Sequence, residues 1–357
     1  PAPAAPAASA RPCHVLCVSA RTEVALRELG ARYAERLADD SFAEVCRTSA
    51  QGRAHLELRR AVVAADAAEA AGALRADFAP ARAERSPSVA FLFTGQGSQY
   101  AGMGRRLHET EPVFRDALER CARALEGRLD VPLLDLLFSG PPERLDETRF
   151  TQPALYALEV ALAELWRSWG VTPAAVLGHS VGELAAAAVA GLVAGEAGAV
   201  FAAARGRILG ALPPGGGMAA VSAGEARIRK AIGPYSGRLS IAAVNGPEET
   251  AISGDADALA EVAATLRAEG VRVRDLAVSH AFHSARLDEA LPALVAAAGA
   301  VPFGRPRVPI VSNLTGRIEP AEFFARPESW GRQAREPVRF GDGVAALAAA
   351  GCRVFLE

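Results

Sequence analysis

The residues best suited to chemistry in this chain form a serine turn flanked by glycines. The sequence Gly-His-Ser-Val-Gly at residues 178–182 follows an apolar run at residues 174–177 and precedes an alanine-rich segment that begins at Glu183. A strand, a tight glycine turn and a helix in this order are typical of a nucleophile elbow, whose strained turn lifts the serine hydroxyl above a sheet. The pattern predicts that Ser180 is a nucleophile; the alternative is an ordinary glycine turn without a chemical role.

A nucleophilic serine needs a base that takes its proton, and histidine commonly serves. The chain contains six histidines. Four are poor candidates because they lie in the leading segment, in a predicted surface helix, or beside the serine, where an elbow turns the side chain away: His14, His55, His108 and His179. The other two, His280 and His283, lie in the sequence His-Ala-Phe-His-Ser, and the residues alone leave both open as the base.

The composition excludes several classes of function. Lys plus Arg number 39 against 41 Asp plus Glu, so no basic field exists for nucleic acid or for an anionic membrane. No stretch approaches the roughly 18 apolar residues of a membrane span, and the start lacks the features of a signal peptide. The five cysteines are scattered, and Cys13 and Cys17 have no second pair to complete a zinc site. We therefore expect a cytoplasmic protein without metal, nucleic-acid or membrane partners.

The leading part of the chain predicts a small module. Residues 1–12 are mostly Ala, Pro and Ser, which bury too little surface to become ordered, so we expect a disordered linker end. A Pro/Arg/Ser-rich stretch at residues 80–87 predicts a boundary. Between these segments, at residues 13–86, we expect a small α/β domain in which strands alternate with helices: 14–19, 23–38, 61–64 and a helix that ends at Arg75.

The rest of the chain predicts an α/β core with an insertion. Residues 89–93 are a continuous apolar run, as expected of a strand covered on both faces, and Gly-Gln-Gly-Ser-Gln at 95–99 turns the chain after it. We expect an α/β-hydrolase-like core in two parts, residues 87–213 and 280–357. The insertion, residues 214–279, suits a ferredoxin-like subdomain with two helices. Its clearest predicted elements are strands at 218–222, 240–245 and 271–278 and a helix at 255–269.

Together these motifs resemble the malonyl-coenzyme A:acyl carrier protein transacylases and the acyltransferase domains of modular type I polyketide synthases. Residues 13–86 resemble the linker that joins the ketosynthase to the acyltransferase, so the resemblance covers almost the whole chain. It implies transfer of a malonyl-type unit from malonyl-coenzyme A, through an acyl-Ser180 intermediate, to the 4'-phosphopantetheine of an acyl carrier protein, with no bound cofactor. The shared motifs occur in the family's order: residues 95–99, 178–182, Arg205, 280–284 and 333–338.

The resemblance also implies roles for single residues. His283 aligns with the general base, and a main-chain carbonyl near Gln333 orients its ring, so no third acid is expected. An elbow offers the N–H of Val181 to the oxyanion, and the resemblance implies that the N–H of Gln96 is the second donor. The alternatives are a packing role for His283 and a plain loop at residues 95–99.

The resemblance implies that three further residues bind or select the extender unit. The resemblance implies that Arg205 binds the free carboxylate of a malonyl group, because a guanidinium can hold a carboxylate by two parallel hydrogen bonds. Arg207 competes for this role, and a plain surface arginine is the default. His280 belongs to a position tied to extender choice. Phe282 stands where methylmalonyl-type members usually carry serine, so its ring predicts malonyl specificity. Val181 and residues 147–152 also resemble the malonyl type.

Several readings compete with a malonyltransferase. A methylmalonyl or other substituted-malonyl extender is the nearest, and a serine thioesterase or esterase shares the elbow and the histidine. The non-enzyme alternative is an inactive structural domain of a megasynthase. The resemblance further implies an adjacent ketosynthase domain as partner and a polypeptide that continues beyond Glu357, since family members extend past their last core strand. The sequence names neither the polyketide nor the carrier protein served.

Overall fold

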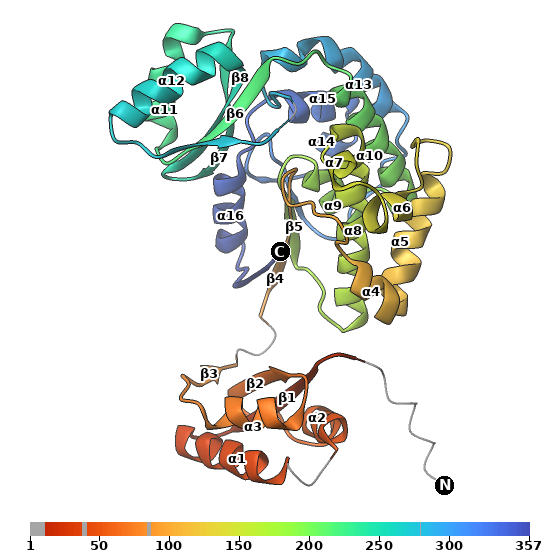
Figure 1. Ribbon diagram of the computed structural model, residues 1–357, viewed down its shortest axis with the longest axis vertical. Helices are drawn as coiled ribbons and strands as arrows, with labels where there is room; N and C mark the ends of the chain where they lie inside the picture. The colour runs from red at the N-terminus through yellow and green to blue at the C-terminus, as the bar shows by residue number, and fades with distance from the viewer. Residues whose placement is uncertain (1–10, 38–40, 84–86, 279) are drawn as a thin grey trace. The chain divides into compact units, whose positions relative to one another are not determined.

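The computed structural model describes residues 11–37, 41–83, 87–278 and 280–357. The chain forms two compact units, Pro1–Pro87 and Ser88–Glu357 (Figure 1). Most of the linker end expected at residues 1–12, and the last residue of the helix expected at 23–38, lie outside the described residues. No helix in the described part of the chain is both long and apolar enough to cross a membrane.

The leading unit is a three-stranded antiparallel sheet packed against helices. Its strand order is β1-β2-β3. Alternate residues of β1, among them Leu16 and Val18, are buried against Leu26 and Leu74 of the helices. The sequence did not predict α2 or β3. The elements are β1 (His14–Ala20), α1 (Glu23–Arg36), α2 (Phe42–Gln51), β2 (Leu58–Ala64), α3 (Ala67–Arg75) and β3 (Ala81–Arg82).

The core of the larger unit is a five-stranded sheet in the order β11-β10-β5-β4-β12. All neighbouring strands pair in parallel except β10 and β11, and Phe93 at the end of β4 lies beside Gly178 at the end of β5. The loop at residues 94–99 and the serine turn therefore leave the sheet at the same edge. The strands are β4 (Val89–Phe93), β5 (Ala175–Gly178), β10 (Ile310–Val311), β11 (Ile318–Glu319) and β12 (Val354–Leu356).

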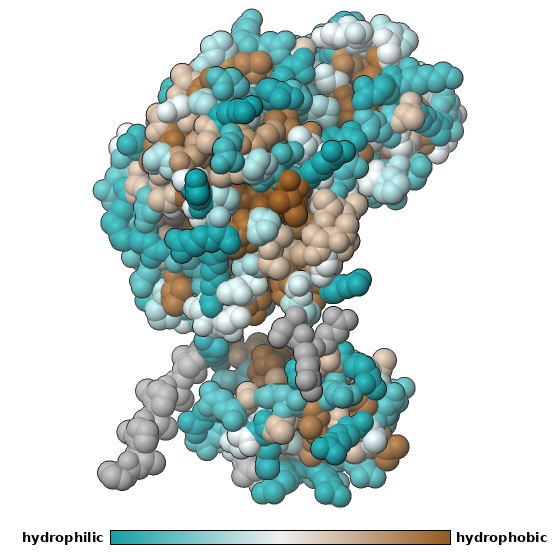
Figure 2. Space-filling view, turned by 180° about the vertical axis from the view of Figure 1, so that it is seen from behind, coloured by the Kyte–Doolittle hydropathy of each residue, from teal (hydrophilic) through white to brown (hydrophobic). Residues whose placement is uncertain are grey.

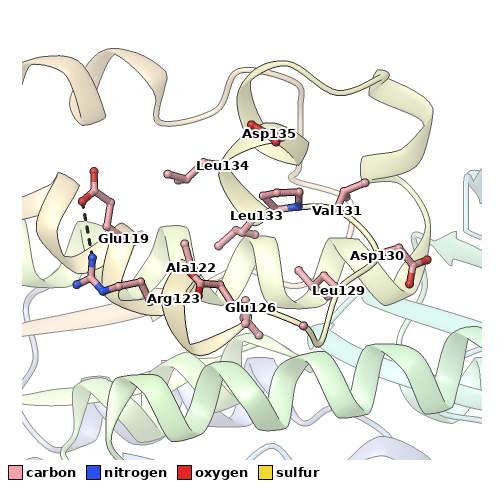
Figure 3. A pocket seen from close by; sticks show the side chains of 13 residues that line it. Glu119, Ala122, Arg123, Glu126, Leu129, Asp130, Val131, Leu133, Leu134 and Asp135 are labelled. Carbon is pink, nitrogen blue, oxygen red and sulfur yellow. Dashed lines mark ion pairs between the residues drawn. The ribbon is translucent and has the colours of Figure 1, made fainter.

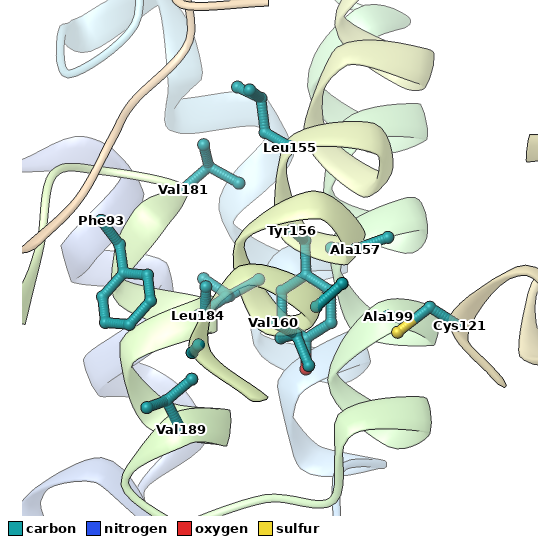
Figure 4. Packing of buried hydrophobic residues seen from close by; sticks show 14 of the residues in the cluster. Phe93, Cys121, Leu155, Tyr156, Ala157, Val160, Val181, Leu184, Val189 and Ala199 are labelled. Carbon is teal, nitrogen blue, oxygen red and sulfur yellow. The ribbon is translucent and has the colours of Figure 1, made fainter. Parts of the chain in front are cut away.

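Long helices pack together beside this sheet. Tyr156 of α8 (Thr148–Ser168) is fully buried, and its hydroxyl donates to the carbonyl of Gly195 at 2.9 Å (Figure 4). A Cβ at Gly198 of α10 (Gly195–Gly210) would lie 2.0 Å from that hydroxyl oxygen, so glycine is what allows the approach of the two helices. Burial of one such large side chain contributes roughly 1.5–3 kcal/mol.

The remaining elements complete the larger unit. On the face seen in Figure 2, hydrophilic side chains predominate and are interrupted by apolar patches.

The helical stretch expected after the serine turn is in fact two helices, α9 (Gly182–Val189) and α10, separated by a turn in which Gly191 has φ +83°. The other helices are α4 (Arg105–Thr110), α5 (Pro112–Ala124), α6 (Leu133–Phe138), α7 (Pro142–Leu145), η2 (Ala285–Ala290), α13 (Leu291–Gly299), α14 (Ala321–Phe324), α15 (Pro327–Arg335) and α16 (Phe340–Ala349).

The insertion has the predicted ferredoxin-like arrangement. Two helices accompany an antiparallel sheet in the order β7-β8-β6-β9, and the subdomain has a hydrophobic core of its own, which includes Ile228, Ile252 and Leu266. The positions of α11 and β8 were not predicted from the sequence. The elements are β6 (Gly216–Val221), α11 (Glu225–Ile232), η1 (Gly233–Tyr235), β7 (Leu239–Gly246), β8 (Glu249–Asp255), α12 (Ala256–Ala268) and β9 (Val273–Leu276).

A short segment of the core pairs with the insertion. The N–H of Val338 donates to the carbonyl of Ala242 at 2.9 Å, and the N–H of Val244 donates to the carbonyl of Val338 at 2.8 Å. Both Ala242 and Val244 belong to β7. The residues just before α16 therefore extend the contact between the inserted sheet and the core.

Candidate active site

Ser180 lies in a strained turn directly after β5. Its φ is +53°, a left-handed conformation that costs a residue with a Cβ about 1–2 kcal/mol. A Cβ at Gly178 would lie 2.1 Å from the carbonyl carbon of Gly182, and one at Gly182 would lie 2.4 Å from the carbonyl oxygen of Thr94. Only glycine fits at both positions. The turn therefore has the close approaches and the backbone strain that define a nucleophile elbow.

His283 is the histidine that contacts this serine. Its Nε2 lies 2.8 Å from Ser180 Oγ, and its Nδ1 lies 2.9 Å from the carbonyl oxygen of Glu336. A carbonyl only accepts, so Nδ1 carries the proton and Nε2 is left to accept the serine proton. Burial, together with the charge of Arg205, lowers the pKa of His283 to about 3, so the ring is neutral at physiological pH. His283 itself has φ +57°.

The other histidine left open by the sequence has a different contact. His280 Nε2 lies 3.0 Å from the carbonyl oxygen of Leu212. As expected, His179 does not hydrogen-bond to the hydroxyl of Ser180. Its Nε2 lies 3.0 Å from Oδ1 of Asn245 in the insertion. The geometry thus separates the two candidates and brings only His283 to Ser180 among the described histidines.

A main-chain carbonyl near Gln333 does face His283, but the assignment of this role to Gln333 itself requires a correction. The carbonyl that orients His283 belongs to Glu336, three residues further along the chain. The side chain of Gln333 instead donates from Nε2 to the carbonyl oxygen of Ser180 at 2.7 Å and accepts from Arg205 Nη2 at 3.4 Å. The reason is the end of α15 at Arg335: Gln333 is still helical and its side chain faces the elbow, whereas Glu336 has left the helix and adopts an extended backbone.

Arg205 lies beside the nucleophile, at 3% exposure. Its Nη1 donates to Gln152 Oε1 at 2.8 Å, and its Nη2 lies 3.5 Å from Ser180 Oγ. Burial lowers the pKa of Arg205 to about 10, so the guanidinium stays cationic near neutral pH. Arg207, the competing arginine, is exposed. A buried cation with one nitrogen near the serine can receive an anionic group of a substrate bound there.

Two residues that sequence reasoning missed hold the elbow in place. Asn313, which follows β10, accepts from the N–H of Ser180 at 2.7 Å through Oδ1 and donates to the carbonyl of Gly178 through Nδ2. Its own N–H donates to Glu183 Oε1 at 2.9 Å. Burial raises the pKa of Glu183 to about 7. No local pattern marks Asn313; only the pairing of β10 with β5 brings it to the serine.

The loop at residues 95–99 adjoins the elbow, as expected. A Cβ at Gly95 would lie 3.1 Å from the Nδ1 and the carbonyl oxygen of His179. The side chain of Gln96 donates to Thr148 Oγ1 at 3.2 Å and accepts from Gln152 Nε2 at 3.4 Å. Within the described part of the chain, neither the N–H of Gln96 nor that of Val181 donates a hydrogen bond, so both remain available to a ligand.

Phe282 directly precedes the base and is buried, at 7% exposure. It packs in a cluster with Leu209, Leu287 and Leu294, and its ring centroid lies 6.1 Å from that of His280. The two residues expected to govern extender choice therefore contact each other next to His283 in the chain.

Other features of the described residues do not coincide with this site. The pocket between α5 and α6 holds about 450 Å³ and is lined by 13 residues between 119 and 135, including the ion pair of Arg123 with Glu119 (Figure 3). It contains none of the candidate site residues. Among the described residues, no group of three or more His, Cys, Asp and Glu side chains is arranged to hold a metal ion. The candidate site brings Ser180, His283 and Arg205 together.

The chain matches two family models. Residues 90–357 match the acyl transferase domain family, and residues 14–74 match a family described as CurL-like, PKS C-terminal. The mycoketide-CoA synthase of Mycobacterium tuberculosis is 43% identical over 350 residues, which are 95% of this chain and 8% of that protein. The chain spans less than a fifth of the length of such curated relatives.

Solved structures agree with this assignment. The acyltransferase domain from module 8 of the salinomycin polyketide synthase has a TM-score of 0.88 and 36% identity, and the match covers 97% of this chain and 84% of that one. The malonyl CoA-acyl carrier protein transacylase of Coxiella burnetii has a TM-score of 0.71 and 30% identity, over 76% of this chain and 87% of that one. The chain therefore belongs to the acyl transferase family, as an acyltransferase domain of the kind found in modular type I polyketide synthases.

Proposed function

We propose that this domain transfers a malonyl unit from malonyl-coenzyme A to the phosphopantetheine thiol of an acyl carrier protein, through an acyl ester on Ser180. The observation that carries the proposal is the contact of Ser180 Oγ with His283 Nε2 at 2.8 Å, with Arg205 Nη2 3.5 Å from the same oxygen. A nucleophile, its base and a cation beside them are what a carboxylate-bearing thioester requires.

In the first half-reaction, Ser180 attacks the thioester carbonyl while His283 Nε2 takes the hydroxyl proton. The carbonyl of Glu336 stabilises the imidazolium that forms, because it accepts from Nδ1–H. The unused N–H groups of Gln96 and Val181 are the proposed donors to the oxyanion. Collapse of the tetrahedral intermediate breaks the carbon–sulfur bond, and His283 returns its proton to the departing coenzyme A thiolate.

In the second half-reaction, the same groups act in reverse order. His283 accepts the proton of the phosphopantetheine thiol, the thiolate attacks the acyl ester, and Ser180 recovers its proton as the leaving group. No water enters this scheme, which is the difference from a thioesterase. An acyltransferase and a thioesterase are therefore distinguished by whether a thiol or water accepts the acyl group.

Arg205 is the proposed ligand of the malonyl carboxylate. It is buried and already oriented by Gln152, so little side-chain entropy is lost when the carboxylate binds. Phe282 and His280 are proposed to limit the room beside the second carbon of the acyl group and so to favour malonyl over methylmalonyl. A pocket of this kind discriminates between two acyl groups that differ by one methyl group by only about 1–3 kcal/mol. A substituted-malonyl extender is therefore the second candidate.

The leading unit supports a further part of the proposal. Residues 14–74 match the CurL-like family, and residues 13–86 resemble a ketosynthase-to-acyltransferase linker. We infer that an adjacent ketosynthase of the same megasynthase and a carrier protein are the domain's partners.

The test is intact-mass measurement of the protein mixed with malonyl-coenzyme A, with and without a phosphopantetheinylated carrier protein. The expected results are a malonyl adduct on the wild-type protein, its transfer to the carrier, and no adduct on Ser180→Ala. An adduct on Ser180→Ala would overturn the mechanism. Steady release of free malonate without a carrier would favour a thioesterase, and the absence of any adduct on folded wild-type protein would favour an inactive domain.

A further inference from the structure

A buried carboxyl group contacts the loop that carries Gln96. Glu159 belongs to α8 and is 7% exposed. Its Oε1 lies 2.8 Å from Thr94 Oγ1, and its Oε2 has no hydrogen-bond partner among the described residues. The proposed mechanism gives this acid no part, although Thr94 is the first residue of the loop.

The contact belongs to a row of four oxygen atoms. Thr94 Oγ1 lies 2.9 Å from Ser98 Oγ, which in turn lies 3.2 Å from the carbonyl oxygen of Gly95. With Glu159 Oε1, the row contains three oxygen–oxygen contacts, and each needs one hydrogen. The hydroxyls of Thr94 and Ser98 supply two of these hydrogen atoms. An ionised Glu159 supplies no hydrogen atom, so one of the three contacts cannot be a hydrogen bond. A protonated Glu159 supplies the third hydrogen atom.

The surroundings of Glu159 favour the protonated acid. It lines an apolar pocket of about 270 Å³ together with Phe93, Leu155 and Trp166. The pocket-facing part of β4 and the loop at residues 95–99 contribute no charged side chain. From the end of β12 the pocket receives Glu357, an acid that repels a second negative charge. Burial raises the pKa of Glu159 to about 8, and it outweighs hydrogen bonds from the side chain and the backbone of Thr94, which lower that pKa.

We propose that Glu159 acts as a neutral acid that donates a hydrogen bond to Thr94 and so fixes the loop at residues 94–98 for catalysis. The row of hydrogen bonds runs from α8 through Thr94 and Ser98 to the carbonyl of Gly95, which is joined by one peptide bond to the N–H of Gln96. Glu159 is a positioning residue, because it does not itself reach the substrate. The inference rests on the proposed function, in which that N–H binds the oxyanion.

The proposal has a pH dependence of definite sign. Below about pH 8 Glu159 holds its proton and the row is complete; above that pH the proton is lost, the row lacks one hydrogen, and the loop loosens. Loss of a whole oxyanion donor slows catalysis by about 10²–10³-fold. Because Glu159 only positions the donor, we expect a smaller decline, of about tenfold, on the alkaline side.

The experiment measures single-turnover formation of malonyl-enzyme between pH 6 and pH 9.5 for wild type, Glu159→Gln and Glu159→Ala. The amide of Glu159→Gln can donate to Thr94 at every pH, so this variant should keep most of the wild-type rate at pH 7 and lose the alkaline decline. Glu159→Ala should be slowed about tenfold at pH 7. Glu164→Gln, on the same helix but paired with Arg120 of α5 and not with the loop, is the matched control and should follow wild type. An alkaline decline that persists in Glu159→Gln would overturn the proposal.

A second measurement does not depend on catalysis. Because the folded pKa lies above that of a free glutamate, the wild-type Tm should fall relative to that of Glu159→Gln as the pH rises from about 5 to about 8. A constant difference in Tm would show that Glu159 is ionised throughout and would refute the proposal. If the Tm difference appears but wild type forms no malonyl adduct, the proposed function fails while the protonated Glu159 stands.

Discussion

Replacement of Arg205 by alanine should abolish the proposed preference of this domain for malonyl over acetyl. The change removes the only arginine within 3.5 Å of Ser180 Oγ among the described residues. Gln152 and Gln333 lose a partner, but Ser180, His283 and the backbone donors remain in place. Acetyl-coenzyme A has the same thioester without the carboxylate, so its transfer reports on the rest of the site.

The size of the effect follows from the burial of Arg205. Removal of one partner of a buried, hydrogen-bonded charge pair costs about 2–5 kcal/mol. At about 1.36 kcal/mol for each factor of ten, this is a loss of about 30-fold to 5,000-fold in kcat/KM for malonyl. Nη1 of Arg205 already donates a hydrogen bond to Gln152, so chiefly Nη2 is available to bind the carboxylate. We therefore expect a loss in kcat/KM at the lower end of this range, about 30-fold to 100-fold.

The assay is rapid-quench intact-mass measurement of acyl-enzyme formation with malonyl- and acetyl-coenzyme A at pH 8. At this pH His283 is neutral whether or not Arg205 is present, because the arginine only lowers a histidine pKa that is already below 8. Arg207→Ala, the exposed neighbour, is the control and should leave both rates unchanged. Equal losses for malonyl and acetyl in Arg205→Ala would refute the reasoning and assign Arg205 a structural role.

Three other predictions test the rest of the site. His283→Ala should slow acyl-enzyme formation by about 10²–10⁴-fold, since it removes the proposed general base, whereas His280→Ala should cost far less; equal losses would contradict the assignment of the base. Asn313→Ala leaves the N–H of Ser180 and the carbonyl of Gly178 without a hydrogen-bond partner. Urea unfolding should therefore show a loss of about 1–3 kcal/mol in the free energy of unfolding for each unpaired group. An unchanged urea midpoint would show that Asn313 does not stabilise the elbow. Replacement of residues 280–282 by Tyr-Ala-Ser should raise the methylmalonyl-to-malonyl ratio in competitive loading, and a ratio that does not rise in a folded, active variant would show that Phe282 does not limit the extender.

The elbow and the fold were predictable because their signals are local. Glycines at 178 and 182 are required by contacts within a few residues or with the adjacent strand, and the apolar run at 89–93 coincides with β4. The ferredoxin-like order was likewise readable from alternating strands and helices. By contrast β8, with the sequence Glu-Thr-Ala-Ile-Ser-Gly-Asp, lacks an alternating pattern, because five successive residues, 250–254, are buried.

The parts of the site that the sequence did not reveal depend on contacts between distant segments. Asn313 reaches the elbow only because β10 pairs with β5, and a lone asparagine in a loop has no distinctive local context. Glu336 orients His283 through its main-chain carbonyl, a group that every residue has. The position where α15 ends decides which carbonyl faces the ring, and helix ends are uncertain from sequence by a residue or two.

The pairing of Val338 with β7 has a consequence for protein engineering. Residues 336–339 hold the base through Glu336, bind the insertion through Val338, and donate to the carbonyl of Asn313 through the N–H of Arg339 at 2.8 Å. A chimera that exchanges only the ferredoxin-like subdomain would join a foreign edge strand to this native segment and would shift the carbonyl behind the imidazole. The natural unit of exchange is therefore discontinuous, and recombinant hybrids should carry the segment before α16 together with the subdomain.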